Sequence, residues 1–339
     1  MTNVAGFSSR TALVLPLPTE LPSAVGCVGD RLARRQDDLG ARYALAMGAD
    51  SSAAAARTEL LAWTDTHAER GRPVEAEPPA GSCVHDRFFA VERAHGDSAG
   101  LLADALLVSD LLVRADLARN GSTLDEDPDN LLLGVTPYLT RTLPPATKHV
   151  VWQPADPDAA AQERWLVGHQ RFFVMLQLLI TGLQELGQAA ETPREQEAVR
   201  GFGWLCRSTA VSMRYAADFP PELYGPVRDT MTPPTVNAGF SGLQTRDHHA
   251  LVSCMRQSKR DGVFDRLAPA SVAAVHAAMQ HLYDAHIWVC DRFGGSHEPS
   301  LLMAQTGQSS GAVPPESGVE AAGRLARQRL GYLSPAGRD

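Results

Sequence analysis

The chain has 339 residues, 44% of them hydrophobic, and 31 basic against 39 acidic residues give it a net charge of -8. A chain of this size and apolar content can build a substantial buried core. The scattered basic residues argue against a nucleic-acid surface, and no apolar run reaches the roughly 18 residues of a membrane span. We therefore expect a globular cytoplasmic protein that binds small molecules, with no nucleic acid and no membrane among its partners.

The cysteines are irregularly spaced, which fits neither a disulfide framework nor a zinc site built from paired CxxC motifs. In a cytoplasmic protein we expect them to be reduced. The five are Cys27, Cys83, Cys206, Cys254 and Cys290.

Helical periodicity dominates the chain, because apolar residues recur at three- and four-residue intervals while strand-like alternation is scarce. In chain order, the expected helices cover about residues 31–47, 51–67, 98–120, 158–186, 193–217, 246–259, 271–291 and 319–330. The helix 158–186 is apolar almost all round at its centre, which indicates deep burial. Proline and glycine clusters separate the helices, most prominently at 71–81, 125–128 and 233–242.

The domain organisation follows from these elements, since the chain has no internal repeat and no clear boundary. We predict an all-α fold with a single domain over residues 1–339. Its parts are an irregular N-terminal region at 1–97, a core at 98–304, and a C-terminal loop and surface helix at 305–339.

Common catalytic motifs are missing from the sequence. No glycine-rich phosphate loop follows a predicted strand, and no GxSxG elbow is present, which disfavours nucleotide binding and a hydrolase triad. The histidines are therefore the best candidates for chemistry. Two of them, His85 and His95, lie near Phe88 and Phe89 in the N-terminal region. They either cover a pocket or pack under it, and we favour packing.

His286 and Cys290 stand four residues apart on the predicted helix 271–291. Residues i and i+4 share a helix face, so one cofactor could meet both side chains. Alone, the spacing is a weak indication, because a histidine and a cysteine on a half-apolar helix usually pack in a core. A zinc site would need two further ligands, and His281 lies five residues away, off the shared face.

Three other histidines, His169, His248 and His249, lie in predicted helices. His169 is in the middle of the most apolar helix, where it is either a satisfied core residue or an active-site base that titrates near neutral pH. His248 and His249 begin a helix directly after a glycine-containing loop at 240–247. Such a position is either incidental or the edge of a substrate or cofactor pocket.

The segment 163–173, in which Gln170 follows His169, resembles a helix of the histidine-ligated heme-dependent aromatic oxygenases. The best-known members of that superfamily are the tryptophan 2,3-dioxygenases, and in them this helix carries a distal-pocket histidine. The resemblance implies their helical fold, and His169 falls on that histidine.

Two later segments extend the resemblance in the same order. Residues 221–229 are similar to the segment whose arginine holds the substrate carboxylate, and Arg228 matches that arginine. Residues 241–245 resemble the SGFQS loop that lines the amino-acid pocket, which implies substrate contacts from Ser241 and Gly242. The stretch between Arg228 and this loop is longer here than in the dioxygenases.

His248 stands where the dioxygenases have a tyrosine, and together with His286 and Cys290 it is similar to the HxnHxxxC pattern of the 3-methyl-L-tyrosine hydroxylases of saframycin biosynthesis. This narrower resemblance implies that His286 ligates heme iron, that Cys290 forms one thioether to the heme, and that His248 is the opposite axial ligand. Whether His249 takes the place of His248 stays open. The resemblance covers about residues 163–290.

The implied activity is that of a heme-dependent hydroxylase, a peroxygenase that converts 3-methyl-L-tyrosine or a related tyrosine to its ortho-hydroxylated catechol in antibiotic biosynthesis. Hydrogen peroxide is the expected oxidant, with dioxygen as the other choice, and a homo-oligomer is compatible with the family. His248 would leave the iron, His169 would handle a proton, and Arg228 would clamp the substrate carboxylate.

Three other interpretations compete. One is a b-type heme hydroxylase of L-tyrosine, or an oxygenase of tryptophan. Another is a non-catalytic bis-histidine heme protein, and the last is a helical interaction protein whose histidines only pack. We rank the hydroxylase first, because a heme sensor leaves the matches at Arg228 and 241–244 without a purpose.

Overall fold

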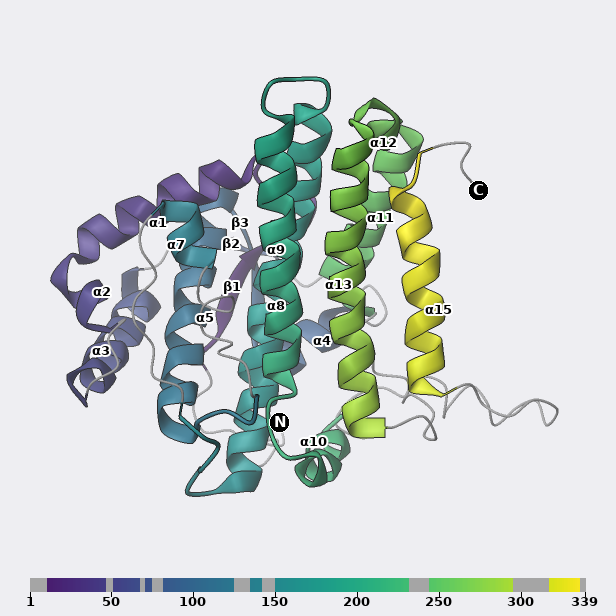
Figure 1. Cartoon of the computed structure of the whole chain (residues 1–339). Coiled ribbons are helices and arrows are strands. Elements are labelled where there is room, and N and C mark those ends of the chain that lie inside the picture. The colour runs from purple at the N-terminus through teal and green to yellow at the C-terminus, as the bar shows by residue number, and fades with distance from the viewer. Residues whose placement is uncertain are drawn as a thin grey trace.

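The computed structural model describes residues 11–46, 51–67, 71–74, 82–124, 135–141, 150–231, 244–294 and 317–335. Within these ranges the chain is predominantly helical, which confirms the all-α class, and one small sheet is added to it (Figure 1). The predicted loops 125–128 and 233–242, with Ser241 and Gly242, lie outside the described residues.

Long helices form the centre of the molecule and lie side by side (Figure 1). In chain order they are α5 (Ser98–Asn120), α8 (Pro157–Ala189), α9 (Glu195–Ala216), α11 (Arg246–Arg260), α13 (Pro269–Gly294) and α15 (Gly318–Leu330). α8 packs on α5, α9 and α11, and α13 lies between α9 and α15. Each agrees with a predicted helix to within three residues at either end.

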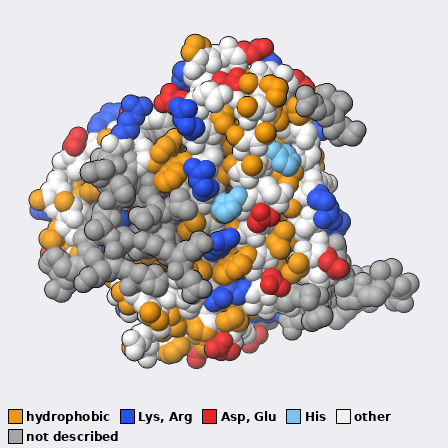
Figure 2. All heavy atoms as spheres, in the orientation of Figure 1, with side chains coloured by type: hydrophobic (Ala, Val, Ile, Leu, Met, Phe, Trp, Pro, Cys, Tyr) orange, Lys and Arg blue, Asp and Glu red, His pale blue; other side chains and the backbone are white. Residues whose placement is uncertain are grey.

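Shorter elements surround this centre. On the α5 side lie α1 (Val25–Leu39), α2 (Ala41–Ala46) and α3 (Ser51–His67), and the remaining helical segments are α4 (Ser82–Phe88), α7 (Val135–Thr140), η1 (Pro221–Leu223), α10 (Tyr224–Asp229), α12 (Val263–Arg266) and η4 (Gly331–Leu333). Figure 2 shows basic, acidic and hydrophobic side chains intermingled over the face formed by α9 and α13, so neither sign of charge dominates that face.

The first predicted helix, 31–47, is wrong in its extent. Val25 begins α1 six residues earlier, and the helix ends at Gly40, which adopts a φ of 48°. Glycine takes this left-handed conformation without the steric cost that a side chain would add. The Gly40 amide donates to the Gln36 carbonyl and closes α1, so α2 starts as a separate helix at Ala41.

A three-stranded sheet is present that the sequence did not predict. Its order is β1 (Leu13–Pro16), β3 (Val91–His95) and β2 (Arg72–Pro73), with β1 parallel and β2 antiparallel to β3. The register places Leu13 opposite Val91. These strands have two to five residues and are too short for a period of two to be visible. The central strand β3 also carries the polar residues Glu92, Arg93 and His95, so it does not read as a continuous apolar strand.

α8 is the central helix of the core. Among the described helices it is the one long and apolar enough to cross a membrane, but 83% of its apolar window is buried in the fold, as expected of a core helix. Gly168 lets α9 approach closely, because a Cβ at this position would lie 2.4 Å from the Cα of Ala216. The backbones of α8 and α9 are therefore in contact directly beside His169.

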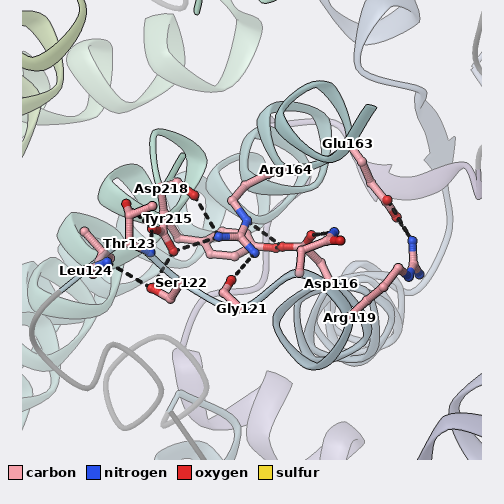
Figure 3. Close-up of polar contacts among 11 residues, drawn as sticks. Asp116, Arg119, Gly121, Ser122, Thr123, Leu124, Glu163, Arg164, Tyr215 and Asp218 are labelled. Atoms are coloured by element: carbon pink, nitrogen blue, oxygen red, sulfur yellow. Dashed lines mark hydrogen bonds and ion pairs between the residues drawn. The ribbon is translucent and has the colours of Figure 1, made fainter. Parts of the chain in front are cut away.

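A buried ion-pair network fixes the first turns of α8 (Figure 3). The fully buried Arg164 donates from Nε to Asp116 of α5 at 2.7 Å and from Nη1 to Asp218 at 2.9 Å. Its Nη2 donates to the carbonyl oxygen of Gly121 at 2.6 Å, and the Tyr215 hydroxyl donates to Asp116. This network ties α5, α8 and the end of α9 to one another.

Candidate active site

His286 and Cys290 share one face of α13, as their spacing predicts. Cys290 Sγ lies 3.8 Å from His286 Nε2, and both side chains are half-buried. Burial lowers the pKa of His286 and raises the pKa of Cys290 to about 11. At neutral pH the face therefore presents a neutral imidazole beside a protonated thiol.

This donor set does not resemble a zinc centre. A structural zinc site needs four ligands, and His286 and Cys290 supply two of them. Nor do the described parts of the chain contain any group of three or more His, Cys, Asp or Glu side chains able to hold a metal ion. The neutral imidazole of His286 keeps a nitrogen lone pair that is available to a metal ion.

The same face of α13 ends in a cluster of aromatic side chains. Phe293 lies seven residues after His286, two turns further along this face. Its ring stacks on Tyr224 of α10 with centroids 4.2 Å apart, and Trp165 of α8 lies 6.2 Å from it. The contacts join α13, α10 and α8 beside the His286 and Cys290 pair. We call this set the aromatic cluster, consisting of Trp165, Phe219, Tyr224 and Phe293.

His169 adjoins the aromatic cluster through Trp165, one turn before it on α8. The two rings are 4.3 Å apart, and Phe89 stacks on His169 at 4.3 Å with an interplanar angle of 3°. His169 Nδ1 lies 2.7 Å from the Trp165 carbonyl oxygen, which assigns the proton to Nδ1 and leaves a lone pair on Nε2. Burial, opposed by this hydrogen bond and assisted by His85, lowers the pKa of His169 to about 4.

The low pKa of His169 predicts an acid-sensitive fold in the cofactor-free protein. Between its ordinary value of 6.5 and about 4, the unfolded chain binds a proton that folded His169 does not. The free energy of unfolding should therefore fall as pH drops through this range, with no such contribution above it. Urea unfolding at several pH values measures the slope. His169→Gln should flatten the slope, and an unchanged slope in this variant would contradict the prediction.

Arg228 lies on α10, which packs against α8. It follows Tyr224 by four residues, so both share one face of this short helix. Because Tyr224 stacks on Phe293, Arg228 is placed one turn beyond the aromatic cluster, and its side chain is half-buried.

The two adjacent histidines of α11 differ in burial. His248 is buried and His249 is exposed. Thr245 caps the helix and accepts a hydrogen bond from the His248 amide at 3.2 Å. α11 packs on α8, the helix that carries His169. Of the pair, His248 is the one that faces the protein interior.

Sequence reasoning missed several residues around the site. Trp165 precedes His169 by four residues, and Tyr224 precedes Arg228 by four, so helical spacing from the predicted site residues could have found both. No local pattern marks Phe89, which stacks on His169 from a segment 80 residues away in the chain. The acidic Asp247, next to His248, was also overlooked, although it is fully buried.

Comparisons with known proteins identify the family. A family model described as SfmD 3-methyl-L-tyrosine peroxygenase matches residues 14–274. Over 284 residues the chain is 31% identical to the 3-methyl-L-tyrosine peroxygenase of Streptomyces lavendulae, a match that covers 76% of this chain and 77% of that protein.

A solved structure gives the same result. The fold is similar to a crystal structure of reduced SfmD, obtained by soaking with sodium hydrosulfite, with a TM-score of 0.61 and 25% sequence identity. The match covers 84% of this chain and 100% of the other. These findings confirm the narrower of the two resemblances seen in the sequence. The chain belongs to the SfmD 3-methyl-L-tyrosine peroxygenase family.

Proposed function

We propose that this protein is a heme-dependent peroxygenase that hydroxylates 3-methyl-L-tyrosine, or a closely related tyrosine, next to its phenol hydroxyl. The observation that carries the proposal is the pair of His286 and Cys290, 3.8 Å apart on the face of α13 that ends in the aromatic cluster. The family match supports the substrate and the use of peroxide, since the relative from Streptomyces lavendulae is named for both.

Residues of α13 and α11 would hold the heme. His286 would hold the iron through its neutral imidazole, and the Cys290 thiol would attach to the porphyrin by one thioether. The buried His248, rather than the exposed His249, would be the second iron ligand. When bound, heme supplies the chemistry that activates the O–O bond of peroxide.

Arg228 and the aromatic cluster would position the substrate. The guanidinium of Arg228 can pair with the amino-acid carboxylate through two parallel hydrogen bonds. The aromatic rings of the cluster offer an apolar surface for the phenol ring. Together these contacts would fix the ring relative to the cofactor, which is the main contribution that orientation makes to catalysis.

His169 would act on the phenol hydroxyl through Nε2. We expected an imidazole that titrates near neutral pH, but burial lowers its pKa to about 4. At neutral pH Nε2 is therefore unprotonated, and it is a weak base. It accepts a hydrogen bond from the phenol and orients it, and it takes the proton only while the ring is being oxidised.

The source of the oxygen atom tests the proposed reaction. One molecule of substrate and one of hydrogen peroxide give one catechol and one water, so the new hydroxyl oxygen comes from peroxide. With ¹⁸O-labelled peroxide, we expect the catechol to carry the label, as measured by mass spectrometry. Label arriving only from ¹⁸O-dioxygen, cleavage of a tryptophan ring, or a heme protein that no aromatic amino acid perturbs would each overturn the proposal in favour of a different function.

Heme attachment gives a second, independent prediction. Acid-acetone should leave the heme on the wild-type chain, and Cys290→Ala should release it, because the thioether has lost its sulfur. The matched control is Cys254→Ala, which removes another half-buried thiol from α11. A pyridine hemochrome assay of both fractions measures the result. Complete extraction from the wild-type chain would contradict a thioether at Cys290.

A further inference from the structure

A buried ion-pair cluster joins three elements next to His248. Arg93 of β3 donates to Asp86 of α4 at 2.7 and 3.1 Å, and to Asp247 of α11 at 2.5 and 3.1 Å. We call this cluster of Asp86, Arg93 and Asp247 the Arg93 clamp. The guanidinium of Arg93 donates two hydrogen bonds to each of the two carboxylates.

Asp247 accepts a further hydrogen bond in addition to those of its ion pair with Arg93. It is fully buried, and besides Arg93 its Oδ1 accepts a hydrogen bond from Gln177 of α8 at 2.8 Å. Arg93 and Gln177 also both donate to the carbonyl oxygen of Pro16 in β1. Burial opposes the charge on Arg93, but the two carboxylates outweigh it and raise the pKa of Arg93 further. Arg93 therefore stays charged.

The clamp fixes the helical turn that carries His248. Asp247 immediately precedes His248, and Thr245 accepts a hydrogen bond from the His248 amide. The first turn of α11 is thus fixed by the hydrogen bonds of the Asp247 side chain and by the hydrogen bond of the His248 backbone amide. Asp86 extends the same restraint to α4, whose His85 lies close enough to His169 to affect its pKa.

We propose that the Arg93 clamp positions His248 for the heme iron and so controls how readily this ligand leaves to open a coordination site. The inference rests on the proposed function, in which His248 is the displaceable ligand. Asp247 and Arg93 act through His248 and are positioning residues. With Asp247 held by three donors, we infer that His248 binds and leaves by rotation of its own side chain rather than by movement of α11.

The chain contains a matched control for this cluster. Asp110 of α5 pairs with Arg171 of α8 at 2.6 Å, and both side chains are buried. Arg171 follows His169 by two residues, which places it about 200° away around the helix and on the opposite face. Asp110→Asn therefore makes the same substitution in a buried Arg–Asp pair that joins α5 to α8.

The experiment compares Asp247→Asn with Asp110→Asn in the heme-loaded full chain. Two readouts apart from activity are used: the low-spin fraction of ferric heme by electron paramagnetic resonance, and the rate constant of cyanide binding. We expect Asp247→Asn to lower the low-spin fraction and to raise the cyanide rate by about tenfold, a coupling typical of residues in one network. Asp110→Asn should leave both values near those of the wild type, even if the chain unfolds at a lower temperature.

His248→Ala supplies the decisive comparison. If the clamp acts through His248, Asp247→Asn should have no further effect on cyanide binding in the His248→Ala background. An unchanged cyanide rate in Asp247→Asn alone, or an equal acceleration in both backgrounds, would overturn the positioning role while leaving the proposed function intact. A wild-type chain that takes up no heme would overturn both. A wild-type ferric heme that is entirely high-spin would overturn the positioning role and the assignment of His248 as an iron ligand, and would leave the peroxygenase reaction intact.

Discussion

Replacing His286 with alanine should lower the affinity of the protein for heme by more than about a hundredfold, since even the loss of a residue that only supports a metal ligand costs ten- to a hundredfold. The imidazole is already neutral because burial lowers its pKa, so its lone pair is available without the release of a proton. Titration of the cofactor-free chain with hemin, followed by the Soret band, measures the affinity.

Two comparisons separate a ligand from a structural residue. His281→Ala removes a half-buried histidine from the same helix, five residues from His286, and should bind heme like the wild type. Added imidazole should restore heme binding to His286→Ala, because it can occupy the space left by the side chain. A wild-type Soret spectrum in His286→Ala would remove this residue as the iron ligand.

Replacing Arg164 with methionine should lower the free energy of unfolding by about 3–5 kcal/mol, the usual cost of removing one partner from a buried ion pair. Arg164 is fully buried, and its loss leaves the carboxylates of Asp116 and Asp218 without their cation (Figure 3). The carbonyl oxygen of Gly121 also loses a donor. Urea unfolding of the cofactor-free chain measures the change.

The surface pair beside this network is the control. Arg119 and Glu163 form an exposed ion pair at 2.8 Å, and Arg119→Met should cost less than about 1 kcal/mol. Equal losses in the two variants would show that Arg164 does not act as a buried cation.

The long helices could be predicted because their apolar residues repeat over many turns. The ranges 51–67 and 98–120 agree with α3 and α5 at both ends. The sheet could not be predicted, because pairing β1 with β3 depends on contacts between residues 78 positions apart in the chain, such as Leu13 with Val91. Short strands gain their stability from such partners and not from their own sequence.

The candidate site also has features that could be predicted from the sequence and features that could not. The shared face of His286 and Cys290 follows from helical spacing alone, and the 3.8 Å separation of their side chains confirms it. The contact of Phe89 with His169 and that of Arg93 with Asp247 join distant segments, and only the tertiary fold brings them together. The single domain over 1–339 and the iron ligands themselves stay predictions.

The contact at Gly168 has a practical consequence for changing the substrate. Because α8 and α9 meet there backbone to backbone, they form an inflexible wall behind His169, and any larger residue at Gly168 would push the two helices apart. If the substrate lies beside the aromatic cluster as proposed, we expect adjustment to a bulkier ring to come from α10, a short helix of six residues. Mutant libraries intended to broaden substrate scope should vary the residues of α10 other than Arg228 and leave α8 and α9 unchanged.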